Sequence, residues 1–150
     1  MAQTTGGASG VGAKVEFSVN GSSWTDISGS ANAVDPGDQS GMSGETYTFS
    51  GDEAVVTAGK TEPAEIDVKI VYTETAGEAF KVVRAQWQTT GRAGYLRWSP
   101  KGGSTGQEQY TTSAGVLISV TWPGVDAGDG KPIMAGFKLK TPKITESTVP

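Results

Sequence analysis

Apolar and polar residues alternate along several short stretches of the chain, which is the pattern of strands with one buried face. The clearest is Glu65–Thr73, where Ile66, Val68, Ile70 and Tyr72 fall on one face. The Asn20-Gly21 pair favours a tight hairpin turn after the first strand. The other predicted strands are Val15–Val19, Trp24–Ile27, Glu45–Phe49, Ala54–Thr57, Gly94–Trp98, Glu108–Thr111, Val116–Trp122 and Ile133–Lys140.

Two of these strands, late in the chain, have buried faces that the alternation defines residue by residue. In the earlier strand, the residues predicted to face the core are Val116, Ile118, Val120 and Trp122. In the later strand, they are Ile133, Ala135, Phe137 and Leu139. Lys138 and Lys140 fall on the opposite side and are expected to point outward.

One segment has helical rather than strand spacing. Apolar residues recur there at intervals of four, three and four, which places them on one side of a helix. Thr75 and Glu78 fit a capping box, and Gly91 is a plausible stop, so we expect a helix over about residues 76–89. The stripe expected to pack on the sheet is Ala76, Phe80, Val83 and Trp87.

The remaining segments have little apolar content. Residues 28–44 contain only Val34 and Met42 as large apolar groups, and an unstructured connection of this length is uncommon unless it has a function. It either precedes a hairpin or forms the tip of a larger one. Residues 1–12 are predicted to be a flexible arm and residues 141–150 a tail, within one domain spanning 1–150.

Composition supports a mostly β protein and excludes several kinds of chemistry. Val (14) and Thr (18) far outnumber Leu (3), and β-branched residues favour strands. The chain has no His and no Cys, which excludes Ser–His–Asp and Cys–His catalysis, disulfides and zinc ribbons. We therefore expect no enzyme and predict no catalytic, metal-binding or cofactor-binding residues.

Charge is distributed unevenly along the chain. Residues 1–78 carry twelve acidic and three basic side chains, a net of −9, whereas residues 79–150 carry four acidic and nine basic side chains, a net of +5. The sum is the overall −4. These charges either cancel within the fold or favour head-to-tail association between copies.

The order of the parts resembles the tail tube (major tail) proteins of long-tailed bacteriophages. Four pieces carry the likeness: KVEFSVNGSSWTDI, then SGSANAVDPGDQSGMSG, then EIDVKIVYTETAGEAFKVVRAQWQ, and finally TSAGVLISVTWPGVDAGDGKPIMAGFKLKTPKIT. Together they cover roughly residues 13–145. The likeness is one of organisation, because this family has no short diagnostic motif.

This resemblance implies an antiparallel β-sandwich or barrel-like core with one flanking α-helix. It also implies hexameric rings that stack into the hollow tail tube of the virion, assembled in the host cytoplasm without a membrane. Such a tube conducts DNA without binding it specifically, houses the tape-measure protein and contacts tail terminator and tip proteins. The long segment would reach the adjacent ring, through Ser28, Val34, Asp35, Pro36, Asp38, Met42 and Gly44.

An alternative interpretation is a monomeric β-sandwich that binds carbohydrate or acts as an adhesin. Its binding platform would be formed by Trp24 and Trp98, since aromatic faces stack on sugar rings. The first residues lack the basic and apolar regions of a secretion signal, which favours the tube over this alternative.

Overall fold

The structure is a computed structural model that describes residues 2–4, 6–128 and 130–150. Within these residues it contains one α-helix, α1 (Ala79–Trp87), and a 3-10 helix at Gly10–Gly12. The strands are β1 (Lys14–Ser18), β2 (Trp24–Asp26), β3 (Ala31–Asp35), β4 (Gly41–Thr46), β5 (Val55–Thr61), β6 (Ala64–Val71), β7 (Ala93–Ser99), β8 (Glu108–Thr112), β9 (Gly115–Thr121), β10 (Met134–Thr141) and β11 (Ile144–Thr148). The prediction of a mostly β fold with a single α-helix is confirmed.

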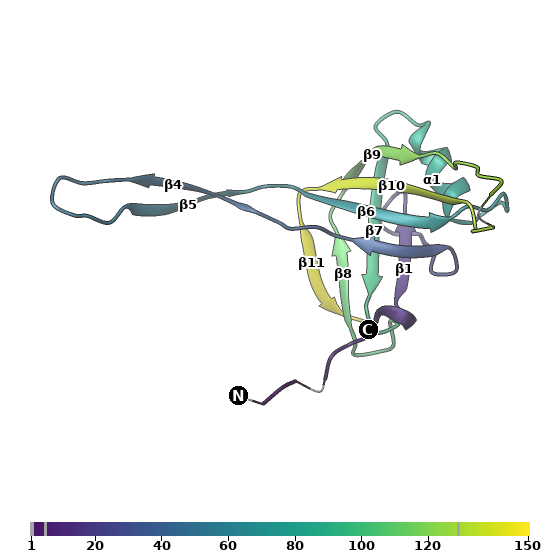
Figure 1. Ribbon diagram of the computed structural model, residues 1–150, viewed down its shortest axis with the longest axis horizontal. Helices are drawn as coiled ribbons and strands as arrows, with labels where there is room; N and C mark the ends of the chain where they lie inside the picture. Colours follow the sequence, from purple (N-terminus) through teal and green to yellow (C-terminus); the bar gives the residue numbers. More distant parts are fainter. Residues whose placement is uncertain (1, 5, 129) are drawn as a thin grey trace.

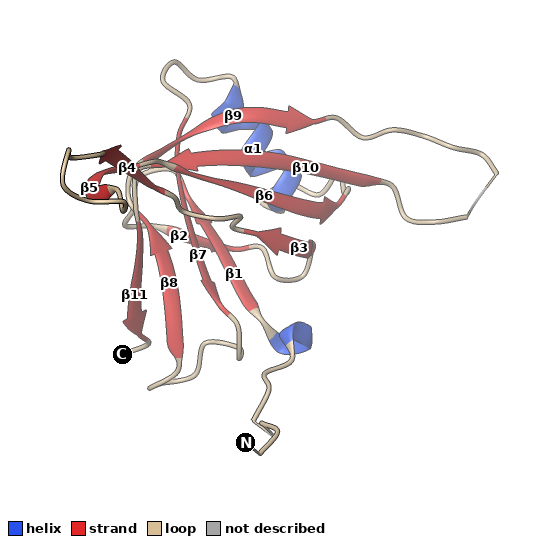
Figure 2. Cartoon of the chain, turned by 60° about the vertical axis from the view of Figure 1, so that its left-hand side comes forward, coloured by secondary structure: helices blue, strands red, loops and turns tan. Residues whose placement is uncertain are grey.

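The strands form two antiparallel layers (Figures 1 and 2). One layer, which we call the front sheet, has the order β9-β10-β6-β3. The second layer has the order β2-β1-β7-β8-β11. Strand β7 belongs to both layers. Its residues 95–99 pair with β1, and two of them also pair with β8, whereas its first residues, Ala93 and Gly94, pair with β9. The predicted sandwich or barrel-like core is therefore confirmed.

The two layers meet through aromatic packing. Phe17 of β1 and Phe137 of β10 make an edge-to-face contact with ring centroids 5.7 Å apart, and both side chains are fully buried. Burial of each large apolar side chain stabilises the fold by about 1.5–3 kcal/mol. Around this pair lie other fully buried side chains: Ile66, Val68, Ile70, Leu96, Leu117 and Leu139. The predicted buried face of Glu65–Thr73 is thus confirmed for Ile66, Val68 and Ile70, while its fourth residue, Tyr72, is half-buried against the core.

The corner where β7 passes between the layers requires glycine. A Cβ on Gly94 would lie 3.1 Å from the Phe17 ring and 3.2 Å from the Leu139 side chain. Its partner across the strands, Gly115, would place a Cβ 2.9 Å from the carbonyl oxygen of Lys140. The absence of side chains at this pair lets the two layers approach closely.

The predicted buried face of β9 is largely wrong. Val116, Ile118 and Trp122 are exposed, and Val120 is half-buried against the core. Leu117, which the alternation placed outside, is fully buried instead. The strand therefore presents apolar side chains on its outer side as well as its inner side.

An irregularity in the pairing of β9 with β10 explains this error. Leu117 lies opposite Leu139, but Ser119 lies opposite Lys138, so Ile118 is an extra residue in the ladder. A bulge of this kind interrupts strict alternation, because the residues on its two sides no longer follow one period of two. In β10 itself Ala135, Phe137 and Leu139 are buried as predicted, whereas Ile133 is exposed.

Helix α1 lies inside the predicted range but begins later. Its N-cap is Glu78, whose side chain makes no capping hydrogen bond, so the predicted Thr75–Glu78 capping box is wrong. The Glu78 carboxylate instead accepts a hydrogen bond from the hydroxyl of Thr73. Gly77, with φ +85°, turns the chain just before the helix, which is why the first turn cannot start at Ala76.

The helix packs on the sheet through three of the four predicted stripe residues, whereas the fourth, Ala76, is exposed and lies before the helix begins. Phe80 and Val83 are buried, and Trp87 is half-buried against the core. The Arg92 guanidinium lies 4.0 Å from the centre of the Trp87 ring, which covers the end of the helix.

The predicted C-terminal tail is not a tail. Residues 144–148 form β11, which pairs along its whole length with β8. Beyond it, the Val149 N–H donates to the carbonyl of Gln107 over 2.8 Å. The paired backbone fixes this segment to the second layer although the sequence has little apolar content there. Before β1, residues 10–12 form the 3-10 helix, and the described residues that precede this helix extend away from the domain (Figure 1).

The packing of α1 gives a direct test of the fold. Phe80→Ala should lower the free energy of unfolding by about 3–5 kcal/mol, because it removes a buried ring that contacts Tyr72 and Trp122 edge to face. Lys81→Ala, the neighbouring half-exposed position, should change it by no more than about 0.5 kcal/mol. Urea unfolding measures both variants, and equal losses would contradict the helix packing.

Candidate assembly surfaces

A hairpin arm projects from one end of the domain (Figures 1 and 2). It consists of β4, β5 and the connecting residues 47–54, and nearly all of its residues are exposed. At its base the Glu62 N–H donates to the carbonyl of Ser40 over 2.7 Å, and the Gln39 side chain donates to the carbonyl of Pro142 over 3.2 Å. The arm is therefore fixed at its root, and nearly all of its length is exposed.

The arm carries large apolar side chains although it has no core of its own. Isolated two-stranded hairpins are at best marginally stable in water, and exposed apolar groups in such a hairpin indicate a contact surface. The exposed apolar residues are Met42, Tyr47, Phe49, Val55 and Val56. Its acidic residues are Glu45, Asp52 and Glu53.

The structure divides the predicted long loop between two different places. Residues 31–35 are β3, an edge strand of the front sheet, and 41–44 begin β4, so the prediction of an irregular loop over 28–44 is wrong. Backbone pairing with β6 explains the difference, because β3 needs few apolar side chains to be held in the sheet. The tip-of-a-hairpin alternative is closer, but the tip lies at residues 47–54.

The residues singled out in that segment are accordingly separated. Ser28 lies in the turn before β3, Val34 packs partly on the core, and Asp35 ends the strand. Pro36 and Asp38 lie in the connection between β3 and the arm. Only the last two residues of the set belong to the arm itself, namely Met42 and Gly44.

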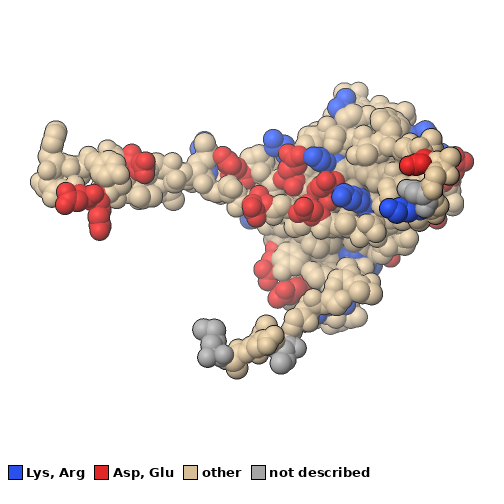
Figure 3. All heavy atoms as spheres, viewed as in Figure 1, with Lys and Arg blue, Asp and Glu red and all other residues tan. Residues whose placement is uncertain are grey.

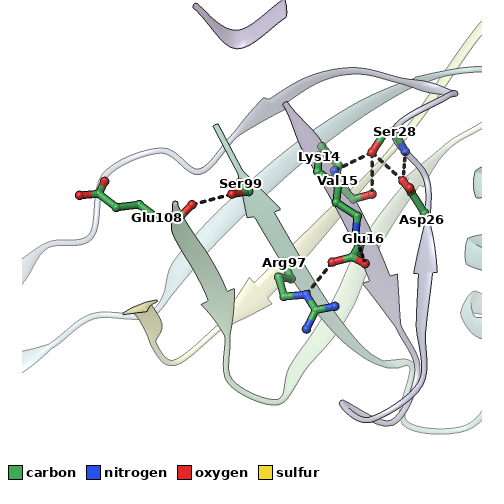
Figure 4. Close-up of polar contacts among 8 residues, drawn as sticks. All are labelled: Lys14, Val15, Glu16, Asp26, Ser28, Arg97, Ser99 and Glu108. Carbon is green, nitrogen blue, oxygen red and sulfur yellow. Dashed lines mark hydrogen bonds and ion pairs between the residues drawn. The ribbon is translucent and has the colours of Figure 1, made fainter. Parts of the chain in front are cut away.

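Ser28 has a structural role at the start of β1 (Figure 4). Its hydroxyl accepts a hydrogen bond from the Val15 N–H over 2.8 Å and donates to the Asp26 carboxylate over 2.6 Å. This hydrogen bond from Ser28 is the main cause that holds the pKa of Asp26 below its ordinary value. The contacts tie the turn after β2 to β1.

The front sheet is open at both edges. Among the described residues, no strand pairs with the outer edge of β3, and β9 pairs with β7 only at Val116 and Gly115. The Leu117 N–H also donates to the carbonyl of Arg92, so the open part of β9 is residues 118–121. Unpaired strand edges favour pairing with another chain.

The outward face of the front sheet carries charges of both signs (Figure 3). Across the strands, Asp67 lies opposite Lys138 and Glu65 lies opposite Lys140. The Lys138 amino group also lies 3.8 Å from a carboxylate oxygen of Glu65. Part of the charge asymmetry along the sequence therefore cancels within the chain, because acidic β6 pairs with basic β10.

The second layer contains a largely buried ion pair on its outer face. The Glu16 carboxylate lies 2.7 Å from Arg97 Nε and 3.1 Å from Lys14 Nζ (Figure 4). Burial acts to raise the pKa of Glu16, but the hydrogen bonds and charges of Arg97 and Lys14 together outweigh it and lower the pKa. The Arg97 guanidinium also stacks 4.2 Å from the centre of the Trp24 ring.

The aromatic platform expected for the carbohydrate-binding or adhesin alternative, Trp24 with Trp98, is not formed. Trp24 lies opposite Ser18, whereas Trp98 lies opposite Val15. Odd and even residues of β1 point to opposite faces, so the two indoles lie on opposite sides of the second layer. Trp98 instead stacks on Tyr110, with ring centroids 5.7 Å apart.

Other kinds of site find little support in the part of the chain that the structure describes. No group of three or more acidic, His or Cys side chains there could hold a metal ion. No helix there is long and apolar enough to cross a lipid bilayer. The open edges and the arm are the features that remain to be explained.

Comparison with known proteins bears on these surfaces. No protein-family model and no curated protein matches the chain. Among solved structures, a chain of the extended sheath–tube complex of the PVC extracellular contractile injection system has a TM-score of 0.70 at 16% identity, over 91% of this chain and 88% of that one. A chain of the six-fold symmetrised baseplate of the anti-feeding prophage has a TM-score of 0.71 at 10% identity, over 99% of each chain.

A third structure, the tail of an empty GTA particle refined with C6 symmetry, contains a chain with a TM-score of 0.65 at 11% identity, covering 99% of this chain and all of that one. The chain has the fold of these tail and injection-system components. The two matches with 99% coverage extend over nearly the whole chain.

The Glu16 ion pair predicts a specific pH dependence. A carboxyl group whose pKa is lowered by folding stabilises the native state above its unfolded pKa of about 4.3, and this stabilisation disappears as pH falls through the folded pKa. Glu16→Gln should therefore cost about 1.5–3 kcal/mol at pH 7 and progressively less below pH ~4. Urea unfolding across this range measures the difference from the unsubstituted protein.

The matched control is Glu146→Gln, at an exposed position of β11. It should follow the unsubstituted protein at every pH. A cost for Glu16→Gln that stays constant down to pH 2.5 would show that the loss comes from packing rather than from the charge.

Proposed function

We propose that this protein is the building block of a bacteriophage-type tail tube, in which six copies form a ring and rings stack into a hollow tube. The proposal is supported by the fold, which is shared with chains of tail and injection-system particles, two of them of six-fold symmetry. The tube conducts DNA and houses a tape-measure protein during assembly in the host cytoplasm. Tail terminator and tip proteins bind its ends.

The two open edges of the front sheet are the observation that carries this proposal. Each neighbouring pair in the order β9-β10-β6-β3 is antiparallel, and the number of strands is even. The edge strands β9 and β3 therefore run in opposite directions, as the arrows in Figure 2 show. Joining β9 of one copy to β3 of the next continues an antiparallel sheet, and this head-to-tail contact closes into a ring.

In such a ring the outward face of the front sheet lines the lumen. Its charged residues are balanced in sign rather than forming a basic patch: three are acidic, Asp35, Glu65 and Asp67, and three are basic, Lys69, Lys138 and Lys140. A strongly basic lining would hold DNA through its phosphates, whereas a balanced one lets it slide. The face therefore suits passage of DNA without specific binding.

We assign contact with the adjacent ring to the arm, residues 41–61, in place of the segment 28–44. The arm has the length, the exposure and the apolar side chains that such a contact needs. Of the residues that the resemblance implied, Met42 and Gly44 keep this role. Ser28 and Val34 belong to the domain and support β1 and β3 instead.

Assembly is the first test. Sedimentation over a wide concentration range should show species well above 15.4 kDa, and electron microscopy should show rings about 100 Å across or rods built from them. Hydrogen exchange should slow on assembly in residues 31–35 and 118–121, because pairing protects edge amides. A protein that stays monomeric at millimolar concentration would contradict the proposal.

Removing the arm separates ring formation from stacking. Residues 41–61 can be replaced by Asn-Gly, because Ser40 and Glu62 are already joined by a backbone hydrogen bond. The variant should melt within a few degrees of the full protein and form rings but not rods. Normal rods seen by electron microscopy would show that stacking does not use the arm.

A further inference from the structure

The large exposed apolar side chains gather mainly at two opposite ends of the molecule. One group is on the arm. The other, which we call the β9–β10 pole, lies on the connection between β9 and β10 and on the first residue of β10, and it consists of Trp122, Val125, Ile133 and Met134. Both views show the arm at one end of the front sheet and this connection at the other (Figures 1 and 2).

The β9–β10 pole presents its side chains from an anchored strand end. Trp122 follows β9 and contacts the buried Phe80 ring edge to face at 6.1 Å, yet 55% of its surface remains exposed. Val125 is 85% exposed. The Asp126 carboxylate accepts a hydrogen bond from the Gly128 N–H over 2.9 Å, and this contact turns the chain just beyond Val125. Exposed apolar groups clustered in this way mark an interaction surface.

The direction of the arm relates the two surfaces. The arm continues along the direction of β6 and leaves the sheet at one end, while the β9–β10 pole lies beyond the other end of the same strands (Figure 1). A second copy translated along this direction therefore brings its pole toward the arm of the first. The same movement repeats without limit, because the two surfaces are different patches of one chain.

We propose that the arm of one copy docks on the β9–β10 pole of a second copy in the next ring. Val56 and Phe49 supply apolar area from the arm, and Trp122 and Val125 receive it. The contact gives the two-stranded arm the apolar cover that it lacks in one chain. This inference rests on the stacked-ring function proposed above and names the receiving surface.

The absence of cysteine allows a direct cross-linking test. Val56→Cys and Val125→Cys are both at exposed positions and should leave the fold unchanged. A mixture of the two single variants, treated under assembly conditions with a short bismaleimide, should give a covalent dimer on a denaturing gel. The double variant should give a ladder of multimers, because each copy carries both surfaces.

The matched control pairs Val56→Cys with Val19→Cys, another exposed valine, in the turn after β1. This pair should give no dimer. Rods that form without Val56–Val125 cross-links, or with Val19 cross-links in their place, would overturn the receiving surface while leaving the tube function standing. Cross-linked ladders without rings would support the docking and overturn the ring. Absence of both cross-links and rings would overturn both the docking and the ring.

A second pair of variants tests the same contact without cross-linking. Val125→Asp places a charge in the proposed interface and should reduce the yield of sedimentable rods by about tenfold or more, with single rings still visible by electron microscopy. Val19→Asp should leave the yield unchanged. Equal rod yields from the two variants would exclude Val125 from the contact.

Discussion

The structure depends on the packing of the front sheet against the second layer through Phe17 and Phe137. The chain contains only 27 Leu, Ile, Val and Phe residues, which suffices for one core between two sheets. That core uses the inner faces of β6 and β10 and leaves the outer face of the front sheet and the whole arm uncovered. The surfaces that this core leaves uncovered are the ones available for assembly.

The connection through β7 determines which edges remain open. Gly94 and Gly115 bring β7 and β9 together over a short stretch, and this closes one side of the sandwich at that point only. In the part of the chain that the structure describes, no strand pairs with the outer edge of β9 at residues 118–121 or with the outer edge of β3, and these two edge strands run in opposite directions. In a monomer such edges expose unpaired backbone N–H and C=O groups, but in a ring the edges of neighbouring copies would pair with each other.

The two outer faces differ in their electrostatics. On the front sheet, acidic and basic side chains face each other across exposed strands, where ion pairs contribute little stability because water screens them. On the second layer, Glu16 is held between Arg97 and Lys14 in a much less exposed position. The first arrangement balances charge on a surface, whereas the second fixes strands β1 and β7 to each other.

The sequence by itself determined the mostly β class, the inner faces of β6 and β10 and all of the packing stripe of α1 except Ala76, because each depends on local periodicity that burial then enforces. It did not determine the outer side of β9, where the bulge at Ile118 is set by pairing with β10. It also missed β3 and β11, which are held by backbone pairing with partners far along the chain. The arm and the β9–β10 pole became candidate surfaces only in the tertiary structure, because exposure at opposite ends is a property of the packed sheets and not of any segment.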